Sequence, residues 1–166
     1  IVVGGTGNVG FLRNSQGNNT NSNDMVLNNM TTGTLDFSSD ATKSALIRSD
    51  KNGIKLDRDL TIGTAGTKNT LLQAGKTGTV TLASGKTVTS TSSNEFFGMT
   101  AGDFISSSGA TIVNNGTLSI GGNKSLGMAV ANSNTGTLET TGIINFTGTN
   151  GAAIYNKGTF SDKGTV

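Results

Sequence analysis

Apolar and polar residues alternate in short segments along most of the chain. Leu118 and Ile120 are separated by one polar residue, and so are Ile144 and Phe146. A period of two predicts strands with one buried face, and no segment has the i, i+3, i+4, i+7 spacing of an amphipathic helix. Glycine precedes most of these segments, where a sharp corner needs its conformational freedom. The pattern therefore predicts short strands joined by Gly- and Asn-containing corners.

The C-terminal third of the chain is self-similar. Three pairs of segments align at offsets of 22, 24 and 26 residues: 134–144 with 156–166, 127–132 with 151–156, and 115–120 with 141–146. Repeats of 20–50 residues are typical of stacked units that cannot bury their apolar faces alone. Together with the alternation, they predict an all-β fold, a right-handed parallel β-helix with coils of about 22–26 residues.

We expect residues 1–166 to form a single β-helix segment. The last repeat stops at Val166 and the first residue is Ile1 rather than Met, which suggests truncation at the C-terminal end and also at the N-terminal end. Residues 14–30 are rich in Asn and Ser with little alternation, so a loop or an irregular coil is expected there.

Composition separates this interpretation from disorder. Gly, Thr, Asn and Ser supply more than half of the 166 residues, and only 33% are hydrophobic. Disordered chains usually carry more charge and Pro, whereas here 13% are charged and Pro is absent. The 46 residues of Ile, Val and Thr suit pleated strands, which favours a folded repeat.

Several classes of function are disfavoured by residue types that are missing. The sequence has no Cys and no His, so it has no disulfide, thiolate nucleophile, Ser-His-Asp triad or usual zinc ligand set. A net charge of +2 offers no polybasic footprint for nucleic acid. No apolar run approaches the ~20 residues of a membrane span. We therefore expect no cofactor, no metal, no nucleic-acid partner and no direct membrane insertion of this segment.

Two glycine motifs near the N-terminus are interpreted as chance matches. Residues 5–10 spell G-x-G-x-x-G after an apolar segment, but a dinucleotide site would require a helix next, and residues 11–19 are poor helix formers. Residues 4–8 resemble the start of a calcium-binding nonapeptide, yet Asn8 replaces the ligating Asp and no second copy follows.

Charged residues concentrate between Asp36 and Asp59, where 10 of the 22 occur. Alternating signs are typical of a solvated face, in which each ion pair contributes little. The same residues could instead form a patch that contacts a partner, and Asp57 and Asp59 could act as the acid and base of a polysaccharide-cleaving β-helix. The candidate partner-binding residues are Arg48, Asp50, Lys51, Lys55, Asp57, Arg58 and Asp59.

The segment 95–99 (Glu-Phe-Phe-Gly-Met) is the densest aromatic cluster and interrupts the alternation. Large apolar residues are normally buried, which predicts a core position at a bend. If exposed, the cluster would be an anchor for a partner.

The N-x-G-T cadence of residues 114–166 resembles the passenger region of type V autotransporters, in particular the large Gly/Asn/Thr-rich adhesins of fusobacterial type. This strong match covers about a third of the chain, and the compositional likeness nearly all of it. The resemblance implies a non-enzymatic, surface-displayed or secreted passenger of an outer-membrane autotransporter. It also implies binding to a host-cell surface protein or glycan, or to other bacterial cells. The lack of Cys fits passengers that cross the outer membrane unfolded.

Three functions stay open at this point. The first is an adhesion segment that is monomeric as a fragment and has no catalytic residues. The second is a β-helix enzyme that cleaves polysaccharides, and the third is a spacer that only extends a larger autotransporter.

Overall fold

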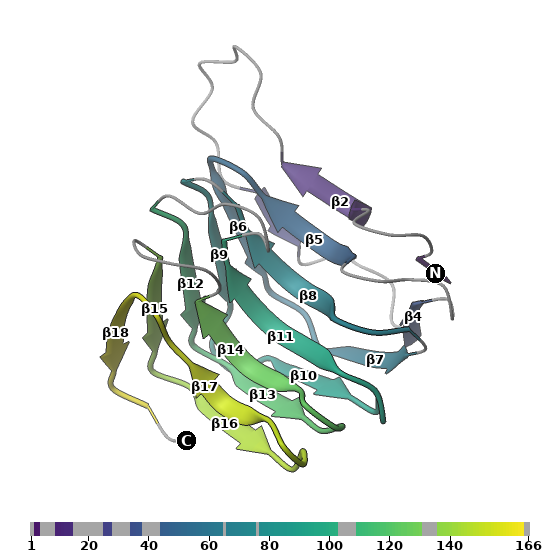
Figure 1. Cartoon of the computed structure of the whole chain (residues 1–166). Helices are drawn as coiled ribbons and strands as arrows, with labels where there is room; N and C mark the ends of the chain where they lie inside the picture. Colours follow the sequence, from purple (N-terminus) through teal and green to yellow (C-terminus); the bar gives the residue numbers. More distant parts are fainter. Residues whose placement is uncertain are drawn as a thin grey trace.

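In the computed structural model of this protein, the described residues are 2–3, 9–14, 25–27, 34–37, 44–64, 66–75, 77–102, 109–130 and 136–164. Over these residues all regular secondary structure is β-strand. The strands follow one another along a stack that begins near the N-terminus and ends near the C-terminus (Figure 1).

The strands form three parallel sheets, which we call sheets I, II and III. Sheet I contains β1 (Val2–Val3), β4 (Thr34–Phe37), β7 (Leu60–Thr64), β10 (Thr87–Ser90), β13 (Thr117–Ile120) and β16 (Ile143–Phe146). Sheet II contains β2 (Val9–Asn14), β5 (Ala45–Ser49), β8 (Asn69–Ala74), β11 (Phe96–Ala101), β14 (Leu126–Val130) and β17 (Ala152–Tyr155). Sheet III contains β3 (Met25–Leu27), β6 (Gly53–Leu56), β9 (Thr79–Leu82), β12 (Thr111–Asn114), β15 (Thr137–Thr140) and β18 (Thr159–Asp162).

Each strand pairs with the strand three places later in the chain, which is the connectivity of a parallel β-helix. The prediction of an all-β solenoid is therefore confirmed. Because the backbone of each coil is hydrogen-bonded to the next coil, most backbone N–H and C=O groups of the strands find partners within their own sheet.

The register confirms two of the three predicted repeat offsets. Thr137 pairs with Thr159 at an offset of 22, and Leu118 pairs with Ile144 at 26. The offset of 24 predicted for residues 127–132 is wrong, because Met128 pairs with Ile154 at 26. The corner before β17 holds this register through a bridge between Asn123 and Thr149. A shift of two residues keeps the same face inward, so the alternation alone could not reveal the error.

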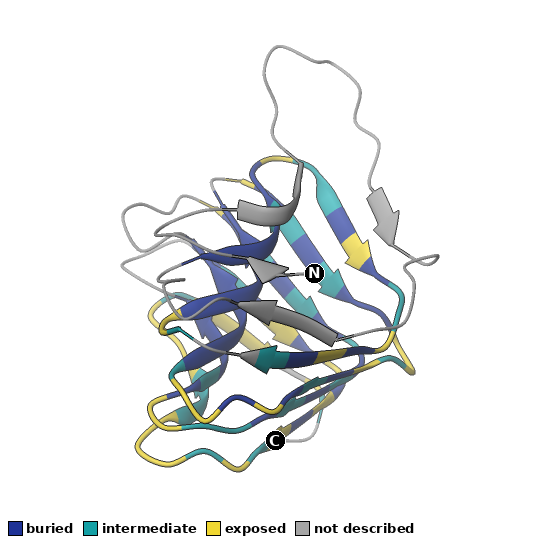
Figure 2. Ribbon diagram, turned by 90° about the vertical axis from the view of Figure 1, so that its right-hand side faces the viewer, coloured by how far each residue is buried: buried dark blue, intermediate teal, exposed yellow. Residues whose placement is uncertain are grey.

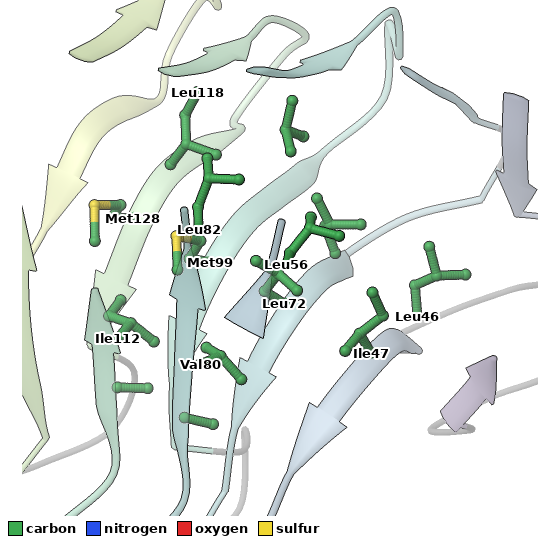
Figure 3. Close-up of a cluster of buried hydrophobic side chains, with 14 of the residues drawn as sticks. Leu46, Ile47, Leu56, Leu72, Val80, Leu82, Met99, Ile112, Leu118 and Met128 are labelled. Carbon is green, nitrogen blue, oxygen red and sulfur yellow. The ribbon is translucent and has the colours of Figure 1, made fainter. Parts of the chain in front are cut away.

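Inward residues stack in columns from coil to coil. Sheet II contributes Ile47, Leu72, Met99 and Met128, all 0% exposed. The matching column of sheet III is Ile54, Val80, Ile112 and Leu138. Figure 3 shows side chains from these columns gathered in the interior of the solenoid. Continuous columns explain how a chain with 33% hydrophobic residues builds one core.

Buried and partly exposed positions alternate along β9 and β12 of sheet III, as the sequence predicts, and Figure 2 shows alternating burial along the strands. Sheet II differs, because all six residues of β8 and all six of β11 are buried. The aromatic cluster falls in β11, with Phe96 0% and Phe97 5% exposed, which confirms its core position, but the two residues lie in a strand rather than at a bend.

One inward column of sheet III changes from apolar to polar. Leu56 and Leu82 are followed by Asn114, which is 0% exposed. Its amide nitrogen donates to the carbonyl oxygen of Ile143 at 3.2 Å, and its Oδ1 accepts from the Gly116 N–H at 3.2 Å. A buried amide with these partners is tolerated in the core and ties the corner after β12 to the next coil.

The N-terminal predictions fall only partly on described residues. Within the stretch 14–30, Asn14 ends β2 and Met25–Leu27 form β3, and the remainder lies outside the described residues. In the G-x-G-x-x-G motif, Val9 and Gly10 begin strand β2, where a dinucleotide site would need a helix.

Candidate functional site

The predicted partner-binding residues lie on one coil, from the end of β5 to the start of β7. Arg48 is on β5, Lys51 is in the turn that follows, and Lys55 is on β6. Asp57, Arg58 and Asp59 form the corner before β7. Of the other charges in this stretch, Asp36 is on β4 with a side chain outside the description, and Asp40 and Lys43 are outside the described residues.

Arg48 and Asp50 form a buried ion pair. Arg48 Nε lies 2.7 Å from Asp50 Oδ1, and the two side chains are 12% and 4% exposed. Arg48 Nη1 also donates to Gln73 Oε1 on the next coil at 2.8 Å. The absence of a side chain at Gly75 leaves room for the pair, since a Cβ there would lie 2.5 Å from Arg48 Nη2. Arg48 and Asp50 are therefore built into the solenoid and present little surface to a partner.

Lys55 and Asp57 form the exposed part of the cluster. Asp57 lies 3.9 Å from the Lys55 amine and 3.8 Å from the amine of Lys86, which belongs to the following coil. The Lys55 and Asp57 side chains are 47% and 31% exposed. Pairs of this kind contribute little to stability because water and salt screen them.

Asp59 links two coils. Its Oδ1 accepts a hydrogen bond of 2.7 Å from the N–H of Thr87, the first residue of β10. Arg58, beside it, is half-buried at the same corner. The two carboxylates proposed as an acid and base thus have different surroundings, since Asp57 faces two lysines and Asp59 is bound to a backbone amide.

Lys86, Gln73 and Thr87 were not predicted as members of this cluster. Each comes from the next coil and reaches it only through the inter-coil register. In the sequence, these contacts could be found only from the repeat offset, which is 25 residues between Arg48 and Gln73 and 28 between Asp59 and Thr87. The repeats visible in the C-terminal third do not extend legibly to this region, so that signal was missed.

A hollow on the outer face of sheet III adjoins the exposed charges. We call it the Lys51–Thr81 hollow, and its volume is about 390 Å³. The residues that line it come from the turn before β6, from β6 and from β9: Lys51, Asn52, Gly53, Ile54, Lys55, Thr79 and Thr81. Two of these, Lys51 and Lys55, are predicted partner-binding residues, so the hollow and the charged cluster form one candidate site.

The turn that carries Lys51 is anchored to the next coil. The Thr77 N–H donates to the carbonyl of Asp50 at 3.2 Å, and the Thr79 N–H donates to the carbonyl of Asn52 at 3.1 Å. The Ser49 hydroxyl also bonds to the carbonyl of Asn52. These bonds hold one wall of the hollow in place.

The described residues contain neither a cluster of metal-ligating side chains nor a membrane-spanning helix. Among them, no group of three or more acidic side chains is placed to hold a metal ion. That part of the chain also contains no helix with the length and apolar character needed to cross a membrane.

Comparison with protein families, curated proteins and solved structures finds no match to this chain.

Proposed function

We propose that this chain is a non-enzymatic segment of a bacterial surface adhesin that binds host-cell receptors or other bacteria. We propose that it lies on the cell surface or is secreted, as part of the passenger of an outer-membrane autotransporter. Two features support this function: the N-x-G-T cadence of residues 114–166, and the concentration of outward charge on a single coil of a regular solenoid.

The concentration of outward charge carries the proposal. In one outward column of sheet III, the residues from successive coils are Lys55, Thr81, Val113, Glu139 and Ser161. Glu139 is the second charged residue of this column, whereas the coil around Lys55 also exposes Lys51 and Asp59. A stiff scaffold that places charged groups at one level suits recognition of a partner without any chemical step.

The enzyme alternative depends on Asp57 and Asp59. A polysaccharide hydrolase needs one protonated and one ionised carboxyl group, both free to approach the substrate. The lysines around Asp57 and the Thr87 N–H bound to Asp59 give both groups structural partners. This arrangement favours binding over catalysis.

The spacer alternative also has an observation in its favour. Coils stack in parallel through all three sheets, and a rod of this kind can simply separate other domains. Spacer and adhesin differ in one measurable respect, which is whether the isolated segment binds cells.

The test is binding of the fluorescently labelled segment to epithelial cells and to bacteria. We expect saturable binding that falls at least fivefold in the triple variant Lys51→Glu/Lys55→Glu/Arg58→Glu. The matched control, Lys124→Glu/Lys157→Glu/Lys163→Glu, makes the same charge change on exposed lysines of other coils and should bind as the unmodified segment does. Binding no higher than that of an unrelated β-solenoid, on every cell type, would contradict an adhesive function and favour the spacer.

A further inference from the structure

We propose that the Lys51–Thr81 hollow binds a saccharide that carries a carboxylate or sulfate group. This inference rests on the proposed adhesive function and names the ligand class that the site would recognise. Three features of the hollow support it: its charge, its hydroxyl groups and its fixed backbone.

The charge of the hollow is positive. Lys51 is exposed and has no ion-pair partner among the described residues. Lys55 is only loosely paired, because Asp57 lies 3.9 Å away and is shared with Lys86 at 3.8 Å. Asp50 adds little negative potential, since its carboxylate is 4% exposed and bound to Arg48. The two lysine amines can therefore bind an anionic group with little competition from protein carboxylates.

Hydroxyl groups lie beside the two amines. Thr79 and Thr81 line the hollow from β9, and a hydroxyl both donates and accepts hydrogen bonds, as the hydroxyls of a sugar ring do. A volume of about 390 Å³ is within the range of small-molecule sites. A charged sugar can use the cations and both the donor and the acceptor capacity of the threonine hydroxyls, whereas an inorganic anion can only accept hydrogen bonds from them.

The same face of sheet III can accommodate a longer chain. Thr79 is in register with Thr111, Thr137 and Thr159, so a column of outward threonines leads away from the hollow across successive coils. Adjacent strands are about 4.8 Å apart, which gives the column a regular spacing. An oligosaccharide anchored at Lys51 and Lys55 could make further hydrogen bonds along this column.

Little ordering is required when the ligand binds. The turn that bears Lys51 is already hydrogen-bonded to the next coil through the carbonyls of Asp50 and Asn52. Preorganised backbone lowers the entropic cost of binding, although the lysine side chains must still be ordered.

The experiment is an NMR titration of the folded segment with a chondroitin sulfate tetrasaccharide. The comparison ligands are the desulfated tetrasaccharide and inorganic sulfate. We expect amide shifts confined to residues 51–55 and 79–81 and their neighbours in sheet III. Lys51→Glu/Lys55→Glu should raise Kd at least tenfold, and Thr79→Val/Thr81→Val about threefold. Lys157→Glu/Lys163→Glu, the same charge change on exposed lysines of the last coil, should alter Kd less than twofold. Far-UV circular dichroism checks that each variant is folded.

Three results would overturn the inference. The first is no saturable binding of the tetrasaccharide up to 10 mM, and the second is equal Kd values for the unmodified and double-lysine variants. The third is inorganic sulfate binding as tightly as the tetrasaccharide, which would leave only an unspecific anion site. Cell binding distinguishes this failure from that of the proposed function. If the segment still adheres to cells while the titration is negative, the adhesive function stands and the saccharide site does not.

Discussion

The buried Arg48–Asp50 pair predicts a large and non-additive loss of stability on mutation. The Nε–Oδ1 distance is 2.7 Å, and the side chains are 12% and 4% exposed. Removing one partner of such a pair leaves the other charge in the protein without that counter-ion, and breaking a buried pair in this way typically costs about 3–5 kcal/mol. Arg48→Met should therefore lower the free energy of unfolding by about 3–4 kcal/mol, because the remaining Asp50 carboxylate has little access to water.

Asp50→Ala should lower the free energy of unfolding by about 2–3 kcal/mol, which is less than the loss expected for Arg48→Met. The remaining Arg48 guanidinium keeps its 2.8 Å hydrogen bond to Gln73 and is more exposed than Asp50. The double variant should lower the free energy of unfolding by about 2 kcal/mol less than the sum of the single variants, since it removes both charges of the pair together.

The assay is equilibrium urea unfolding followed by far-UV circular dichroism. Tyr155 fluorescence gives a second probe, since the chain has one Tyr and no Trp, and coincident transitions would support two-state analysis. The exposed pair Lys55–Asp57 provides a control cycle with an expected coupling below about 0.5 kcal/mol. Single variants of Arg48 and Asp50 that each cost under about 1 kcal/mol and simply add would refute the argument from burial.

Three further predictions test the core and the corners in the same unfolding assay. Gly142→Ala should lower the free energy of unfolding by more than about 3 kcal/mol, because the added Cβ would collide with the backbone of the preceding coil. Gly121→Ala should lower it by less than about 1 kcal/mol, because the nearest atom to the added Cβ would be a hydroxyl oxygen at 3.2 Å. Leu72→Ala should cost about 2–5 kcal/mol, since Leu72 is 0% exposed in the central column; a smaller loss would mean a loosely packed core. Thr100→Val should stabilise the protein by about 1 kcal/mol, because the buried Thr100 hydroxyl has no hydrogen-bond partner among the described residues. Thr140→Val should instead destabilise it, because the Asn114 amide loses one of its two acceptors; equal effects of the two substitutions would contradict this reasoning.

The all-β solenoid could be predicted from sequence because its signals are local. Alternation places Leu118 and Ile120 on one face whatever the rest of the chain does, and the corner residues mark where each strand ends. Where two copies of the repeat are similar enough to align, their offset also predicts which residues stack on each other in neighbouring coils, as for Leu118 and Ile144. The β11 cluster was predicted to be buried for the simpler reason that large apolar side chains avoid water.

Inter-coil register required the structure. Met128 pairs with Ile154, two residues beyond the predicted Ala152, because corners of variable length absorb residues without changing which face points inward. Whether a charged side chain is buried or exposed depends on that register. Arg48 and Lys55 look alike as isolated cations in the sequence, yet one lies against Asp50 and Gln73 and the other lines an open hollow.

The sequence by itself thus determined the type of strand, the type of core and the absence of Cys and His chemistry, all of which follow from residue type and short-range period. Only the tertiary structure decided which charges are buried, which backbone amide Asp59 binds and where the outer surface is hollowed. The physical reason is that these properties depend on residues 25–28 positions away, brought into contact by the winding of the coils.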